Sequence, residues 1–195
     1  LQSINKQTQS FSELLVVLDG PVSKKTESTL TELQKCSTEF VVTLIRLPKN
    51  RGLGAALACG VLKAKGDWLL RMDDDDYSYP ERLENQLNFI AKNPDVDLCG
   101  CNIHEISRNG MLLGIRKCPQ RHKDIKRIMK SMNSMNHVTV LVRKEAILSA
   151  GNYSSDYEGY EDYELWVRML LNGATFSNLD KVFVDVLFDK GQMAR

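Results

Sequence analysis

The sequence lacks long hydrophobic runs, a cysteine-pair motif and any excess of one charge. Its longest unbroken apolar run is Leu14 to Leu18, whereas a membrane-spanning helix needs about 20 apolar residues. No secretory signal is visible at its start. The formal net charge of +1 creates no global field that would attract nucleic acid. We therefore expect no nucleic-acid partner, and any anion site has to be local.

Cysteine and histidine are too scattered to form a zinc site. The five cysteines contain no C-x-x-C pair, and His104, His122 and His137 are too scattered to combine with them as the ligands of one zinc ion. The odd number of cysteines favours reduced thiols that are mostly buried as small apolar side chains. This usage is typical of a cytoplasmic protein.

The overall composition is that of an ordinary soluble domain. Hydrophobic residues make up 43% of the 195 residues and charged residues 26%. The chain shows no internal repeat and no linker rich in proline or glycine. A single α/β domain over residues 1–195 is therefore predicted.

Hydrophobic patterning predicts alternating strands and helices in the first half of the chain. The second half mixes the two types less regularly. Alternation of this kind predicts an α/β fold with a mostly parallel sheet sandwiched by helices. The expected strands are 13–18, 40–47, 67–72, 96–101, 111–116, 137–143 and 181–188, and the expected helices are 23–36, 53–65, 122–132, 162–172 and one that starts at the capping box Ser78-x-x-Glu81.

Four consecutive aspartates, Asp73 to Asp76, follow the predicted strand 67–72. Neighbouring carboxylates repel and raise each other's pKa, so a bound cation would make the cluster easier to accommodate. Mg²⁺ and Mn²⁺ prefer carboxylate and phosphate oxygens, and ligands bind at the carboxyl ends of parallel strands. The cluster therefore indicates a Mn²⁺ or Mg²⁺ site, although a solvated acidic turn fits the four acids alone equally well.

Two other acidic motifs fit poorly. An EF-hand loop that starts at Asp73 would place Tyr77 at a ligand position and Ser78 where glycine is needed. A phosphatase motif of the form D-x-D-x-T would need threonine where Tyr77 stands.

Two segments carry a resemblance to a known family. Residues 47–86 (LPKNRGLGAALACGVLKAKGDWLLRMDDDDYSYPERLENQ) resemble the centre of glycosyltransferase family 2, the inverting enzymes with the GT-A fold. Residues 151–170 (GNYSSDYEGYEDYELWVRML) resemble the family's glutamate–aspartate motif. The opening LQSINKQT resembles its first helix, and LLVVLDGP its second strand. The similarity is greatest to the bacterial polysaccharide-biosynthesis branch, and it implies that the family's first strand is missing here.

The resemblance assigns the acidic cluster to the donor and its metal. It implies that Asp75 coordinates the metal on the diphosphate and that Asp73 contacts the ribose or the metal. Asp76 would orient sugar hydroxyls. The family often has a late histidine that completes the metal site, but residues 184–190 contain none.

Further donor contacts are implied nearer the start of the chain. Asp19 matches a residue that contacts the nucleotide base, or it is a turn residue before Gly20-Pro21. The loop Asn50, Arg51 and Gly52 matches the nucleotide loop, where a helix N-terminus would favour an anion, although it also reads as an ordinary loop. His137 matches a histidine near the active site, or it is structural.

Asp162 matches the general base of the family, with Glu161 beside it. A base has to reach the acceptor hydroxyl on the face opposite the departing diphosphate. A helix start stabilises a carboxylate as the anion, although acidic first turns are also common. Trp166 lies one turn later and is expected in the core rather than on a sugar ring.

The resemblance implies transfer of a sugar from a nucleotide-diphosphate donor, expected to be a UDP-sugar, to a glycan or lipid-linked acceptor. Two alternatives remain: a non-catalytic nucleotide-sugar-binding fragment and a sugar nucleotidyltransferase. One basic helix side reads as a solvated face or as a surface for peripheral association with the inner face of the membrane. Its residues are Lys123, Lys126, Arg127 and Lys130.

Overall fold

The computed structural model describes residues 3–188, which divide into two compact units. Unit 1 comprises Leu1–Gln9, Leu70–Arg143 and Gly173–Arg195, and unit 2 comprises Ser10–Leu69 and Lys144–Asn172. Each unit is therefore assembled from segments that are distant in the sequence. The expectation of a single domain stays a prediction.

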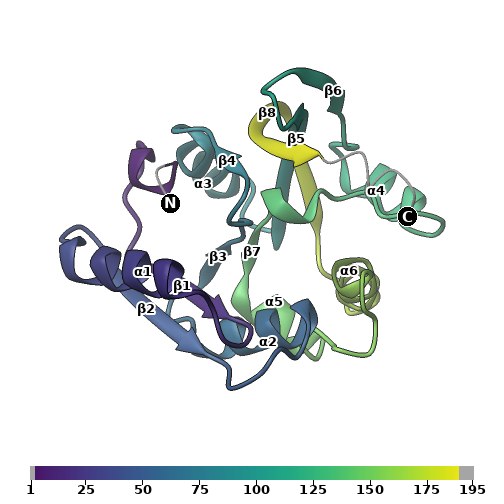
Figure 1. Ribbon diagram of the computed structural model, residues 1–195. Helices are drawn as coiled ribbons and strands as arrows, with labels where there is room; N and C mark the ends of the chain where they lie inside the picture. Colours follow the sequence, from purple (N-terminus) through teal and green to yellow (C-terminus); the bar gives the residue numbers. More distant parts are fainter. Residues whose placement is uncertain (1–2, 189–195) are drawn as a thin grey trace. The chain divides into compact units, whose positions relative to one another are not determined.

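Unit 2 contains a parallel pair of strands with helices. Strands β1 (Glu13–Leu18) and β2 (Val41–Arg46) pair in parallel and are joined through helix α1 (Lys24–Cys36) (Figure 1). Helix α1 begins after Ser23, whose hydroxyl accepts a hydrogen bond from the backbone N–H of Thr26 at 3.1 Å. The other helices of the unit are α2 (Leu53–Lys63), α5 (Lys144–Ser149) and α6 (Glu161–Leu171).

Unit 1 is built around a mixed sheet with strand order β3-β7-β5-β8-β4, in which β6 also pairs with β5. The long strands β5 and β8 are parallel, whereas the β4–β8, β5–β6 and β5–β7 pairs are antiparallel. The α/β expectation is confirmed, and antiparallel pairing is commoner in this sheet than the sequence indicated. The strands are β3 (Trp68–Leu70), β4 (Tyr77–Ser78), β5 (Leu98–Ser107), β6 (Leu112–Arg116), β7 (Leu141–Arg143) and β8 (Phe176–Phe188), accompanied by helices α3 (Arg82–Lys92) and α4 (His122–Ile128) and the 3-10 turns η1 (Ile4–Lys6) and η2 (His137–Thr139).

Each unit has its own core. In unit 1 the first six residues of β5 are all buried, and Cys101 and Ile103 pack with Phe183 and Val184 of β8. In unit 2 Trp166 is fully buried and lies edge-on to Tyr153, with ring centroids 6.3 Å apart. Trp166 is therefore a core residue, as expected. Among residues 3–188 no helix is both long and apolar enough to cross a bilayer.

The predicted starts of two elements are wrong. The capping box does not form, because Ser78 lies in β4 opposite Val184 and helix α3 starts only after Glu81, with no side-chain cap. His137 does not open a strand, because residues 137–139 form a 3-10 turn and β7 begins at Leu141. Thr139 fixes this turn by donating to the carbonyl of Asn136 at 2.8 Å.

Two further expectations are met only in part. The helix expected at 122–132 is shorter in the structure, because α4 ends at Ile128, and Met132 is exposed. All five cysteines are free thiols, but full burial is limited to Cys99 and Cys101. Burial raises the pKa of the Cys99 thiol to about 12, so this side chain behaves as an apolar group.

Candidate functional site

The acidic cluster is preserved in the structure as a set of converging carboxylates. Asp73, Asp75 and Asp76 each offer an oxygen, and the three oxygens lie within 4.8 Å of one another. Asp74 and Asp75 are exposed, whereas Asp73 and Asp76 are half-buried. The chain turns here between β3 and β4, and three of the four aspartate side chains come together at one point.

A buried guanidinium group holds the start of the cluster. Arg71 donates from Nη2 to Asp73 at 2.6 Å, and its side chain is 10% exposed. Arg82 is fully buried and donates to the backbone carbonyl of Arg71 at 2.8 Å and to Gln86 at 3.2 Å. Gln86 in turn donates to the carbonyls of Cys99 and Thr139. The strand end before the aspartates is thereby fixed to α3, β5 and η2.

Asp76 is in an environment that suits a cation. Its Oδ1 accepts a hydrogen bond from the backbone N–H of Leu187 at 3.3 Å, whereas its Oδ2 is buried without a hydrogen-bond partner. Burial and the neighbouring Asp73 and Asp75 raise its pKa to about 6. A buried carboxylate oxygen without a partner is costly.

The donor set fits a hard divalent cation. Three carboxylates with a free oxygen would satisfy Mg²⁺ or Mn²⁺, which are completed by water and phosphate oxygens. Both Asp73 and Asp75, the expected metal ligands, belong to the set. The segment 184–190, in which the sequence shows no late histidine, lies only partly within the described residues, which end at Phe188.

In unit 2 the predicted nucleotide loop is braced by Asp19. Its two carboxylate oxygens accept hydrogen bonds from the backbone N–H groups of Arg51 (2.7 Å) and Gly52 (2.9 Å). The Asn50 side chain also accepts from Gly52, at 3.0 Å. The structure thus brings Asp19 together with the loop Asn50 to Gly52, which the resemblance also assigns to the nucleotide. It gives Asp19 a clear structural task, the shaping of this loop at the start of α2.

Helix α2 approaches the start of α6 closely. A Cβ atom added to Gly54 would lie 2.2 Å from the carbonyl oxygen of Ser154 and 3.2 Å from Cγ of Glu161. Only glycine permits this contact. Glu161 is buried as a result. The predicted nucleotide loop and the predicted catalytic helix are therefore packed against each other within unit 2.

Asp162 lies in the first turn of α6 and is half-buried. Glu161 and Glu164 share this turn, where the helix dipole favours negative charge. Asp162 has the helix position expected of a base. Asp162 belongs to unit 2, whereas the acidic cluster belongs to unit 1.

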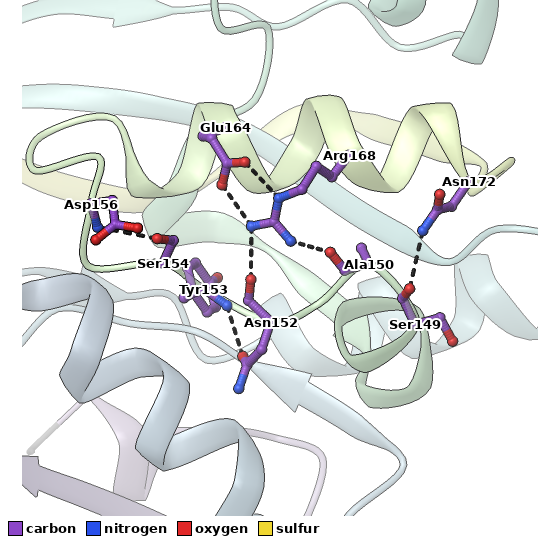
Figure 2. Close-up of polar contacts among 9 residues, drawn as sticks. All are labelled: Ser149, Ala150, Asn152, Tyr153, Ser154, Asp156, Glu164, Arg168 and Asn172. Atoms are coloured by element: carbon purple, nitrogen blue, oxygen red, sulfur yellow. Dashed lines mark hydrogen bonds and ion pairs between the residues drawn. The ribbon is translucent and has the colours of Figure 1, made fainter.

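Arg168 fastens the loop that precedes α6 (Figure 2). It forms a two-pronged ion pair with Glu164, with both N–O distances at 2.6 Å. It also donates to the backbone carbonyls of Ala150 and of Asn152, the latter at 2.7 Å. Asn152 has a positive φ of 66° and donates to the carbonyl of Ala58 on α2 at 3.1 Å. The loop leading to Glu161 and Asp162 is thus held from both helices.

His137 sits in unit 1, in the turn before β7. Desolvation and the Arg71 guanidinium lower its pKa well below the ordinary value, so its imidazole is neutral at physiological pH. The influence of Arg71 associates His137 with the acidic cluster. A contact with the donor stays a prediction.

Comparison with known proteins decides the family. The sequence model of glycosyl transferase family 2 matches residues 1–150. The chain belongs to this family. An uncharacterised glycosyltransferase of Haemophilus influenzae is 33% identical over the whole chain and 71% of its own length. The amylovoran biosynthesis glycosyltransferase AmsE of Erwinia amylovora is 33% identical over 95% of the chain and 68% of its own length.

A third family 2 relative carries a more specific name. It is the UDP-Gal:alpha-D-GlcNAc-diphosphoundecaprenol beta-1,3-galactosyltransferase of Escherichia coli, 35% identical over 97% of the chain and 68% of its own length. Among solved structures, S. aureus TarS 1-349 matches with a TM-score of 0.73 at 22% identity, over 95% of the chain and 55% of the TarS chain. TarS in complex with UDP gives a TM-score of 0.70. These matches confirm the family and the fold predicted from the sequence.

The sequence interpretation missed the basic and small residues that organise the family 2 site. Arg71, Arg168 and Gly54 were not singled out. Arg71 stands two residues before Asp73, a spacing that places both on the same side of an extended chain. Arg168 stands four residues after Glu164, the spacing of a helical ion pair. Gly54 carried no local signal, because its contact is made with a distant segment.

Proposed function

We propose that this chain is the catalytic part of an inverting glycosyltransferase that uses a UDP-sugar. Its acceptor is a saccharide on a lipid carrier, and its pathway is the synthesis of a bacterial surface polysaccharide. The observation that carries the proposal is the convergence of Asp73, Asp75 and Asp76 around an unpaired, buried oxygen of Asp76. The names of the amylovoran and galactosyltransferase relatives and the TarS–UDP complex support the donor and acceptor classes.

On the donor side, Asp73 and Asp75 would hold Mn²⁺ or Mg²⁺, and Asp76 would support them and orient sugar hydroxyls. When bound, the cation neutralises the charge that develops on the departing diphosphate. Arg71 keeps Asp73 in place. Asp19 shapes the loop Asn50–Gly52, which leads into α2. The N-terminus of α2 would then bind the diphosphate through its backbone N–H groups and its dipole. His137, in its neutral form, completes the proposed donor contacts.

On the acceptor side, Asp162 takes the proton of the attacking hydroxyl. The hydroxyl oxygen forms a bond to the anomeric carbon as the bond from that carbon to the diphosphate breaks, so the configuration inverts in one displacement. Asp162 lies in the first turn of α6, where the helix dipole favours the negative charge that a general base has to carry. Glu161, buried against α2, fixes the start of the helix rather than reaching the substrate.

Calorimetric titration of UDP tests the donor site. We expect binding that requires Mn²⁺ and is lost in Asp75→Asn. Asp74→Asn is the matched control, because Asp74 is exposed and lies outside the converging set. Equal binding with and without metal, or unchanged binding by Asp75→Asn, would contradict the proposed site.

A second experiment tests the base and the reaction. With a UDP-sugar and a GlcNAc-diphosphate lipid, Asp162→Asn should lose at least about a hundredfold in transfer while it binds UDP normally. The control is Asp156→Asn, a change of an exposed residue in the loop before α6. This variant should transfer the sugar as the wild type does. Release of UDP identifies a glycosyltransferase, whereas release of pyrophosphate would identify a nucleotidyltransferase. UDP binding without any turnover would favour the binding-only alternative.

A further inference from the structure

The hairpin of β5 and β6 in unit 1 exposes an unusual amount of apolar surface. Its turn is closed by hydrogen bonds from Ser107 N–H to the Met111 carbonyl (2.9 Å) and from Gly110 N–H to the Ser107 carbonyl (2.8 Å). On the returning strand, Met111, Leu112, Leu113 and Ile115 are each between 43% and 58% exposed. Scattered exposed apolar residues are normal, but four within five positions form a patch of the kind that marks an interaction site.

The exposure extends to both faces of the returning strand. Successive side chains of a strand point to opposite faces of its sheet, so Leu112 lies on one face and Leu113 and Ile115 lie on the other. Within residues 3–188, β6 pairs with β5 alone, in the register Ile103↔Arg116 to Ile106↔Leu112. A register shift at Glu105/Ile106 interrupts the ladder. Leu112 on one face of β6 and Leu113 and Ile115 on the other are therefore all 43–51% exposed.

The segment that contains this patch is basic. Residues 106–123 contain five basic side chains and no acidic one, although the whole chain has a net charge of only +1. Arg116 lies against the Phe188 ring, with its guanidinium carbon 5.5 Å from the centroid, and pairs with Glu105. The five basic residues are Arg108, Arg116, Lys117, Arg121 and Lys123.

Exposed apolar side chains beside basic residues favour one kind of binding partner, an anionic lipid surface. Two copies of the hairpin would bring like charges together, which opposes self-association. A lipid surface matches both properties, since apolar side chains enter the interface while lysine and arginine stay at anionic headgroups. Helix α4, where the sequence first suggested membrane contact, adds charge but buries its apolar residues Ile125 and Met129.

We propose that the β5–β6 hairpin docks this chain on an anionic membrane, with Met111, Leu112, Leu113 and Ile115 in the lipid interface. The proposal goes beyond sugar transfer and needs neither the metal nor the base. Membrane contact would explain why these four apolar side chains are exposed together on one hairpin.

Co-sedimentation with vesicles tests the proposal. The chain should bind vesicles of phosphatidylglycerol and phosphatidylethanolamine and should bind phosphatidylcholine vesicles much more weakly. Leu112→Asp combined with Leu113→Asp should lower the partition coefficient by at least about tenfold, and Lys117→Gln by roughly fivefold. Leu171→Asp is the matched control, because Leu171 is 81% exposed but lies on α6 in unit 2. It should bind as the wild type does.

A second measurement does not depend on loss of function. Leu113→Trp should shift its fluorescence emission to the blue when anionic vesicles are added and should be quenched by brominated lipid. Absence of wild-type binding, or equal binding by the double aspartate variant, overturns the proposal. A concentration-dependent dimer that this variant abolishes overturns it in favour of a second copy. UDP titration in solution is independent of these results, so failure here leaves the proposed function untouched.

Discussion

Arg168 offers the sharpest test of how the loop before helix α6 is held. Replacing it with methionine keeps much of the aliphatic length but removes the ion pair to Glu164 and the hydrogen bonds to two backbone carbonyls. The side chains of Arg168 and Glu164 are 28% and 19% exposed, so water compensates only part of the loss. Hydrogen bonds to charged groups contribute about 1.5–3 kcal/mol each, and the cost does not add fully. We expect a net loss of about 2–3 kcal/mol in the free energy of unfolding.

The change should be visible in thermal unfolding. For a chain of this size 1 kcal/mol corresponds to roughly 2–4 °C, so Arg168→Met should lower Tm by about 5–10 °C. Hydrogen exchange should rise in residues 150–160, which the side chain fastens. Arg127→Met is the matched control, because its pair with Asp124 is a helical surface pair and Arg127 is 74% exposed. Its Tm should not change measurably. If Arg168→Met also melted within about 1 °C of the wild type, the proposed role of the clamp would be wrong.

Further predictions concern glycine packing and the acidic cluster. Gly54→Ala should destabilise unit 2 by more than about 2 kcal/mol and weaken UDP binding, because the added methyl group meets a backbone carbonyl. The control in the same unfolding assay is Gly114→Ala, whose added methyl group would have its nearest neighbour 3.8 Å away. Asp76 has a folded-state pKa of about 6 against an ordinary 3.8. The folded state therefore binds its proton more tightly, and without metal the stability contributed by this group falls as pH rises from about 4 to 6. Asp76→Asn should flatten that part of the Tm–pH curve, and an unchanged slope would contradict the burial argument.

Much of the fold followed from local pattern. The strands at 13–18 and 40–47 and the helices between and after them were predictable, because apolar periodicity and short turns are properties of neighbouring residues. The same holds for the acidic cluster, whose members are consecutive. The strand expected at 137–143 starts only at Leu141, because residues 137–139 form a 3-10 turn. In this turn the Thr139 hydroxyl donates to the Asn136 carbonyl and accepts from the backbone N–H of Cys101.

What the sequence could not provide was contact between distant segments. Ser78 had the right spacing for a cap, but β8 pairs with its backbone and Gln7 donates to its hydroxyl. The buried chain from Gln86 through Arg82 to Arg71 also joins segments that no periodicity connects. The resemblance named Asp19 as a nucleotide contact, whereas the structure adds that both of its oxygens support the loop.

The interleaved composition of unit 2 has a consequence for how the chain comes into being. The loop at Asn50–Gly52 belongs to the segment Ser10–Leu69, but the residues that pack against Gly54 belong to Lys144–Asn172. The first segment is synthesised before the second, and Leu70–Arg143 is synthesised between them. Until the second segment is synthesised, the surface of α2 at Gly54 therefore lacks the residues that pack against it. The last segment of this unit to be synthesised is Lys144–Asn172, which contains α6 and the proposed base Asp162.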